Sequence, residues 1–195
     1  MVAKGLDFEN VTLVGVISAD QSLYVDDYRA AERTFSLLTQ VVGRAGRGAR
    51  TGRAVIQTYT PQNDVILCAA EQDYDRFFDS EIRLREVRGL PPYRDLYVFT
   101  VSGPDEGAVL RSCMRLADGL RAWQSDPALQ GSALQILGPA AAPVLMVNKR
   151  YRYRITVLGK SGPALRNMVG YLLKTAHTDQ LNRGVSVYAD LNPMD

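Results

Sequence analysis

Hydrophobic and polar positions in the first third of the chain follow two different periods. Residues 11–18 (VTLVGVIS) form a mostly apolar, β-rich run, which predicts a strand buried on both faces of a parallel sheet. Residues 28–42 carry apolar side chains at steps of four, three and four, which predicts an amphipathic helix. Residues 54–60 form a second β-rich run. This order predicts a βαβ unit and therefore a parallel α/β sheet.

A longer helical pattern follows and ends at two adjacent prolines. We expect a single helix over residues 64–88, with a buried stripe that includes Tyr74 and Phe78. The sequence GLPPY at residues 89–93 stops this helix, because two prolines cannot continue it. We place a domain boundary at this joint.

The rest of the chain predicts strand, helix, strand, strand, helix and strand. These segments cover residues 95–102, 108–123, 134–137, 150–158, 164–176 and 185–190, and residues 138–149 connect the two middle strands. Trp123 and Tyr171 fall on the apolar stripes of the two helices, which favours core packing for both. A βαββαβ order suits a small split βαβ sandwich with both helices on one face of the sheet.

Composition narrows the class of protein. Of the 195 residues, 46% are hydrophobic and 23% are charged, which is typical of a soluble domain. No apolar run approaches the roughly 20 residues of a membrane span, and the first residues lack an apolar signal-peptide core. We therefore expect a cytoplasmic protein with no membrane partner.

Cysteine and histidine content argues against a metal site in this chain. Cys68 and Cys113 lie far apart among apolar residues, so we expect reduced, buried thiols. His177 is the single histidine and no zinc-ligand spacing is present. We expect no metal bound by these residues.

Basic residues are concentrated in two segments, although the formal net charge is only +2. Six arginines and one acid, Glu32, lie between Arg29 and Arg53. Five basic residues and no acid lie between Lys149 and Lys160. Local patches of this kind can bind phosphate groups even when the whole chain is nearly neutral.

The first basic segment contains the sequence QVVGRAGRGAR. Gln40 and Arg44 are four residues apart, so on a helix they would share a face, with Arg47 one turn further along. Glycines such as Gly43 remove side-chain bulk beside the guanidinium groups, whose planar donors match phosphate oxygens. The residues alone leave open a solvated loop, a loose nucleic-acid contact or a specific phosphate site.

In the second basic segment, RYRYRITV, arginines alternate with large apolar residues. Strand periodicity places Arg150, Arg152 and Arg154 on one face and Tyr151 and Tyr153 on the other. The arginine face could be an ordinary solvated sheet face or a DNA-binding surface.

Two of these motifs resemble a known enzyme family. QVVGRAGRG resembles motif VI of superfamily 2 helicases, which belongs to the second RecA-like lobe. VAKGLDF at residues 2–8, about thirty residues upstream, resembles motif V of the same lobe. The blocks SEIRLREVRGLPPYRDL, GPAAAP, RYRYRITV and VYADLNP resemble, in this order, the C-terminal region of the PriA family of primosomal replication-restart helicases.

The resemblance implies roles for the motif VI residues. Arg44 and Arg47 would be catalytic and reach the γ-phosphate of ATP bound to the other lobe. Gln40 and Gly43 would contribute to the nucleotide site. An arginine finger of this type accelerates phosphoryl transfer by about 10³ to 10⁵.

The resemblance also implies roles outside motif VI. In motif V, Gly5 and Asp7 would link the nucleotide to the DNA backbone, and Lys4 stands where many relatives carry arginine. Lysine keeps the charge there but lacks the bidentate fork. Together with Lys4, Arg150, Arg152 and Arg154 would contact DNA.

The resemblance implies a domain plan. Residues 1–65 would be the C-terminal half of RecA-like lobe 2, and residues 66–94 a linking helix with its Pro-Pro joint. Residues 95–195 would be a small α+β domain resembling ribosomal protein S10. We expect the strands of the first region to expose apolar surface and to favour self-association.

By the same resemblance, the intact protein would be an ATP-dependent 3′–5′ DNA helicase. It would recognise stalled or abandoned replication forks and initiate primosome assembly. Its cofactors would be ATP, Mg²⁺ and, on cysteines not in this chain, Zn²⁺. Its partners would be branched and single-stranded DNA, single-strand-binding protein and other primosome proteins.

The printed sequence contains no G-x-x-x-x-G-K-[ST] loop and no acidic magnesium box. We therefore expect this chain alone to hydrolyse no ATP. The alternative is a non-enzymatic DNA- or protein-binding adaptor that keeps the helicase motifs as a scaffold. An RNA helicase is disfavoured by the PriA-type blocks.

Overall fold

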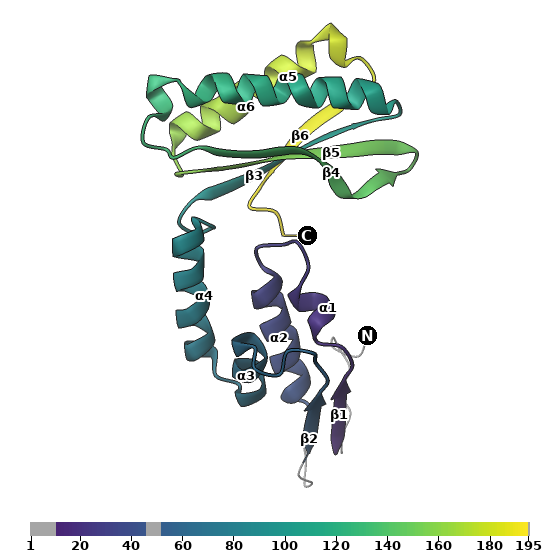
Figure 1. Ribbon diagram of the computed structural model, residues 1–195, viewed down its shortest axis with the longest axis vertical. Coiled ribbons are helices and arrows are strands. Elements are labelled where there is room, and N and C mark those ends of the chain that lie inside the picture. The colour runs from purple at the N-terminus through teal and green to yellow at the C-terminus, as the bar shows by residue number, and fades with distance from the viewer. Residues whose placement is uncertain (1–10, 46–51, 195) are drawn as a thin grey trace. The chain divides into compact units, whose positions relative to one another are not determined.

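The computed structural model describes residues 11–45 and 52–194 (Figure 1). These residues divide into two units, one ending at Leu84 and the other running from Arg85 to Met194. Each unit has its own hydrophobic core. The described part of the chain contains no helix long and apolar enough to cross a membrane.

The first unit contains the expected βαβ arrangement. Its elements are β1 (Leu13–Val16), α1 (Asp20–Leu23), α2 (Ala30–Val42), β2 (Arg53–Ile56), α3 (Asp64–Glu71) and most of α4 (Tyr74–Arg88). Strands β1 and β2 pair in parallel, with Leu13 opposite Arg53. The α/β prediction with a parallel sheet is confirmed, although both strands are shorter than expected.

The core of the first unit lies on one side of the β1–β2 pair. The buried rings of Phe35 and Phe77 stack with centroids 4.2 Å apart. Leu13 is 64% exposed and Val55 is 52% exposed. The prediction that the first of these strands is buried on both faces is therefore wrong for the described residues, because none of them covers the second face.

The helix expected over residues 64–88 is two helices. Asn63 begins α3 by accepting a hydrogen bond from the backbone N–H of Val65 (3.0 Å). Gln72 ends α3 in the left-handed region, at φ 57°. The backbone N–H of Asp73 then donates to the carbonyl of Cys68 (2.9 Å). This C-terminal motif breaks the helix that periodicity alone had joined.

The break also changes which face of α4 is buried. Phe77 is 5% exposed, whereas Tyr74 is 59% exposed and Phe78 is 46% exposed. The predicted buried stripe through Tyr74 and Phe78 is therefore wrong. Both rings still contact aromatic neighbours, because Tyr74 lies 6.2 Å from Phe35 and 6.1 Å from Phe78 between centroids.

Asp20 holds the segment that follows β2. One carboxylate oxygen accepts hydrogen bonds from the hydroxyls of Thr58 (2.9 Å) and Thr60 (3.1 Å), and the other accepts from the backbone N–H of Tyr59 (3.0 Å). Burial alone would raise the pKa of Asp20, but these hydrogen bonds outweigh it and lower the pKa below 3.8.

A carboxylate with a lowered pKa stabilises the folded state above the pKa of the unfolded chain, and this contribution disappears as the pH falls. We expect the wild type to lose more free energy of unfolding than Asp20→Asn when the pH drops from about 6 to about 3. Urea unfolding at several pH values measures the difference. The exposed Asp26→Asn is the control, and equal pH dependence in all three proteins would contradict the assignment.

The second unit is a four-stranded antiparallel sheet with two helices on one face (Figure 1). Its elements are β3 (Asp95–Gly103), α5 (Glu106–Gln124), β4 (Gln135–Val147), β5 (Arg150–Gly159), α6 (Pro163–Thr178) and β6 (Ser186–Leu191), with short 3-10 turns at Pro127–Leu129 and Gln180–Asn182. The strand order is β4-β5-β3-β6. This confirms the predicted split βαβ topology.

Strand β4 is much longer than the four residues predicted for it. It continues through residues 138–147 with register shifts between Leu137 and Ala140 and between Ala141 and Met146. Asn148 and Lys149 form the turn to β5 with φ values of 51° and 60°. A two-residue turn with both φ values positive matches the twist of a hairpin, so the expected connector is part of the sheet.

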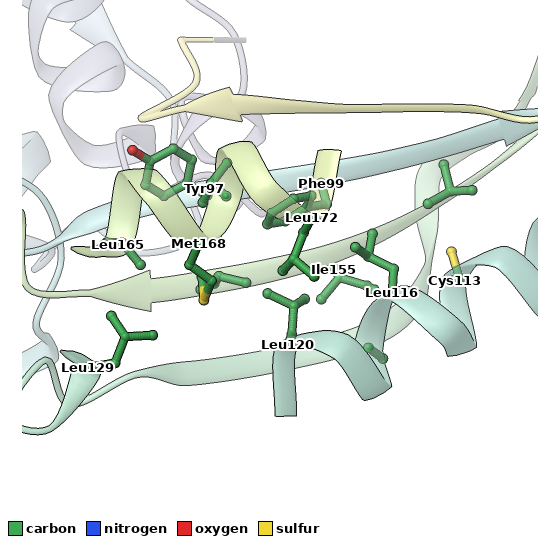
Figure 2. Close-up of a cluster of buried hydrophobic side chains, with 14 of the residues drawn as sticks. Tyr97, Phe99, Cys113, Leu116, Leu120, Leu129, Ile155, Leu165, Met168 and Leu172 are labelled. Atoms are coloured by element: carbon green, nitrogen blue, oxygen red, sulfur yellow. The ribbon is translucent and has the colours of Figure 1, made fainter. Parts of the chain in front are cut away.

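The core of the second unit joins the sheet to α5 and α6 (Figure 2). Phe99 and Ile155 from the central strands are fully buried, as is Leu120 from α5. Tyr171 is 57% exposed, so its predicted core position is wrong, but its ring lies edge-on to that of Trp123 at 5.7 Å.

Leu120→Ala would leave a cavity in this core and lower the free energy of unfolding by about 2–5 kcal/mol. Leu181 is 71% exposed, so Leu181→Ala should stay within about 0.5 kcal/mol of the wild type. Urea unfolding followed by far-UV circular dichroism measures both. Similar losses for the two variants would show that the helices do not pack on the sheet as described.

Candidate nucleic-acid interface

The end of α2 carries the described part of the sequence QVVGRAGRGAR, which is residues 40–45. The helix ends at Val42, and the N–H of Gly43 donates to the carbonyl of Thr39 (2.9 Å). Arg44 lies in the following turn, where its N–H donates to the carbonyl of Val41 (3.1 Å). Arg44 therefore lies beyond the last residue of α2, so the condition for the predicted shared face, that Gln40 and Arg44 stand on one helix, is not met.

Gly43 also has a packing role. A Cβ at this position would lie 3.4 Å from the side-chain nitrogen of Gln72 and 3.2 Å from the carbonyl oxygen of Thr39. The break between α3 and α4 thus packs closely against the end of α2. Gln40 donates from its side chain to the hydroxyl of Ser36 (3.3 Å).

Four other predicted site residues, Lys4, Gly5, Asp7 and Arg47, lie outside the described residues. Of the predicted nucleotide site, the structure therefore places Gln40, Gly43 and Arg44 near one helix end. Their proposed contact with ATP remains a prediction.

Strand β5 presents the second basic segment as expected. Tyr151 and Tyr153 pack against the hydrophobic core, and Arg150, Arg152 and Arg154 alternate with them. The three arginines therefore lie on the sheet face opposite α5 and α6, which we call the arginine face. This alternation is confirmed.

A hydrogen bond from Tyr153 joins the core-facing side of β5 to α5. The hydroxyl of Tyr153 donates to a carboxylate oxygen of Glu106 (2.7 Å), at the start of α5. This bond, together with burial, raises the pKa of Tyr153, so the phenol remains protonated at neutral pH. The strand is tied to α5 at the position between Arg152 and Arg154.

Arg150 is held by the ends of the neighbouring strands. Its guanidinium donates to the carbonyl of Ser102 (2.8 Å) on β3 and to the hydroxyl of Ser186 (3.1 Å) on β6. A weaker contact joins its Nε to the hydroxyl of Ser102 (3.4 Å). These contacts order the guanidinium at one end of the arginine face.

Arg152 and Arg154 make no ion pair with any carboxylate in the described ranges. The Nε of Arg154 is buried and has no hydrogen-bond partner among the same residues. A buried donor without an acceptor costs about 1–3 kcal/mol, and more when it is charged. An anion that supplied the acceptor would recover this cost.

The sequence analysis missed the companions of these arginines. Ser102, Ser186 and Tyr188 share the arginine face, as the pairing of β3 with β5 and β6 shows. Tyr188 is 41% exposed. The alternation in SVYADL, with Val187 and Ala189 packed on the core, was the signal that could have found Ser186 and Tyr188. The alternation in β3, with Phe99 and Val101 in the core, was the corresponding signal for Ser102.

A cavity of about 970 Å³ lies at the end of α6, lined by residues 176–180 and 182–187. Two of its polar lining residues make contacts within the fold. Asp179 pairs with Nε of Arg115 at 3.3 Å, and Asn182 donates to the carbonyl of Ala176 (2.8 Å). These contacts join the loop to α5 and to the end of α6.

The cysteines are inert by their surroundings. Cys68 and Cys113 are free and buried, which confirms the prediction. Burial raises the pKa of both thiols, that of Cys113 to about 12. The described residues contain no group of three or more His, Cys, Asp and Glu side chains that could hold a metal ion.

The fold and the site define a class: an α/β protein in which a βαβ unit precedes a split βαβ domain with a basic sheet face. The family model for the primosomal protein N C-terminal domain matches residues 86–194. The chain belongs to the PriA family.

Three curated relatives are named Replication restart protein PriA. The protein of Bacillus subtilis strain 168 is 39% identical over 99% of this chain and 23% of its own length. That of Synechocystis is 41% identical over 80% of this chain and 18% of its own length. That of Treponema pallidum strain Nichols is 33% identical over 100% of this chain and 28% of its own length. The chain thus spans about a quarter of the length of the relatives it matches.

Proposed function

We propose that this chain is a region of an ATP-dependent 3′–5′ DNA helicase that acts in replication restart. Membership of the PriA family supports this function. The intact protein would recognise stalled or abandoned forks and initiate primosome assembly. It would use ATP and Mg²⁺, and Zn²⁺ on residues outside this chain, and it would bind branched and single-stranded DNA, single-strand-binding protein and other primosome proteins.

The two units have different roles in this proposal. The first would be part of a RecA-like lobe whose Arg44 and Arg47 complete an ATP site on another lobe. Gln40 and Gly43 would contribute to the nucleotide site, and Gly5 and Asp7 would link the nucleotide to the DNA backbone. The second, a split βαβ domain that we expect to resemble ribosomal protein S10, would hold DNA. Lys4 would add a contact from the first unit.

The observation that carries DNA binding is the arginine face. Arg150 is ordered by Ser102 and Ser186, and Arg152 and Arg154 have no carboxylate partner in the described residues. Pre-positioned guanidinium groups without carboxylates favour phosphate, whose oxygens match their planar donors.

The chain should bind forked DNA at low salt, with an affinity that falls steeply as salt rises. Three phosphate contacts give a slope of log K against log salt of about −3, and the double variant Arg152→Ala/Arg154→Ala should lose about two units of slope. Fluorescence anisotropy with labelled forks measures both.

The matched control for this experiment is Arg121→Ala. Arg121 is exposed on α5, pairs with Asp118 at 2.9 Å and lies on the helical side of the domain. Its loss should leave binding unchanged. No binding at low salt, or equal slopes for the double variant and the wild type, would refute the role of the arginine face.

The helicase role itself is tested in a full-length protein that carries this sequence. Arg44→Ala should lower DNA-stimulated ATP turnover by about 10³ to 10⁵ and leave DNA affinity unchanged, because a finger arginine acts in the transition state. Arg33→Ala, on the helix α2 that precedes Arg44, is the control, since Arg33 pairs with Asp27 (2.8 Å). ATP turnover is measured by phosphate release.

The second candidate function is a non-enzymatic adaptor that keeps the motifs as a scaffold. It predicts that Arg44→Ala retains full function in replication restart. Self-association is a further part of the proposal, supported by the exposed side chains of Leu13, Ile17 and Val55 on one face of β1 and β2 and the segments that continue them. Sedimentation velocity of the chain would detect it.

A further inference from the structure

We propose that Tyr188 and Arg154 form a subsite for one unpaired nucleotide on the arginine face, with the base stacked on the Tyr188 ring and its phosphate at the Arg154 guanidinium. This inference rests on the proposed DNA binding by the same face. It adds a residue that specifies single-stranded over double-stranded DNA.

Strand register places the two side chains in one row. Thr100 on the central strand β3 pairs with Arg154 on one side and with Tyr188 on the other. All three point away from α5 and α6, because Val101 and Tyr153, which neighbour Thr100 and Arg154, pack on the core. Two strand spacings put the Cα atoms of Arg154 and Tyr188 about 10 Å apart, with the short threonine between them.

Tyr188 is the one aromatic residue on this face of the described strands. The residue is 41% exposed, and its side chain makes no hydrogen bond or ring contact with another described residue. Its neighbours Val187 and Ala189 pack inward, so the strand holds the ring on the arginine face. A half-exposed aromatic ring fixed beside guanidinium groups is the combination that single-stranded nucleic acid requires.

The charges at the two ends of the arginine face determine where the phosphates of a bound strand lie. Asp190 lies on the same face, one row beyond Tyr188, opposite Val98. Its carboxylate repels phosphate from that side. The phosphates therefore lie over the other end of the face, along Arg154, Arg152 and the ordered Arg150, where no described carboxylate pairs with them.

Only unpaired bases can stack on Tyr188, so the proposed subsite distinguishes single-stranded from duplex DNA. In a duplex both faces of each internal base are covered by its stacked neighbours, whereas an unpaired base can stack on an aromatic side chain. The arginines bind phosphates of either form. Tyr188 therefore adds affinity only for single strands, on the order of tenfold.

The experiment compares a single-stranded oligonucleotide with a blunt duplex of the same length, using the full chain. Tyr188→Ala should weaken single-strand binding on the order of tenfold and leave duplex binding unchanged. Tyr188→Phe keeps the ring and should bind as the wild type does. The salt slope should be unchanged by either variant, whereas Arg154→Ala should lower it by about one unit.

A direct signature of stacking accompanies the affinities. An oligonucleotide containing 2-aminopurine should be quenched on binding to the wild type and to Tyr188→Phe, and less so on binding to Tyr188→Ala. Urea unfolding of each variant verifies that substitution at this half-exposed position leaves the fold intact.

The outcomes separate this inference from the proposed function. If the wild type binds neither DNA at low salt, the proposed DNA binding fails and the subsite fails with it. If the wild type binds DNA but Tyr188→Ala matches it on single strands, or loses equally on the duplex, the subsite alone is overturned.

Discussion

The antiparallel pairing of β3 with β5 is the constraint on which the second unit depends. Phe99 opposite Ile155, and Val101 opposite Tyr153, bury their side chains under α5 and α6. Because side chains alternate along a strand, a shift by one residue would place arginines in the core. The burial that stabilises the domain therefore also fixes Arg150, Arg152 and Arg154 on the opposite face of the sheet.

The two basic segments differ in what positions them. The second lies within a regular strand whose register both neighbouring strands determine. In the first segment, Arg44 follows the end of α2, where Gly43 is the C-cap residue and lies close to Gln72.

The spacing of hydrophobic residues correctly predicted the features in which buried positions recur at a regular interval. These are the βαβ unit, the βαββαβ order and the alternation of β5. The same spacing failed where a local feature overrode the period. Gln72 in the left-handed region divides one expected helix into two. The register shifts of β4 interrupt its alternation, so residues 138–147, which include two prolines, were not predicted as strand. Tyr188 was missed because its role depends on which strand lies beside β6, and strand order is a tertiary property.

The most direct test of the central claim, that the arginine face contacts DNA, is amide chemical-shift mapping of the labelled chain during titration with a single-stranded oligonucleotide. The account predicts that the largest shifts fall on β5 and β6, at Arg152, Arg154 and Tyr188. The exposed sides of α5 and α6 should shift little. Shifts concentrated on the helices, with β5 unchanged, would contradict the account.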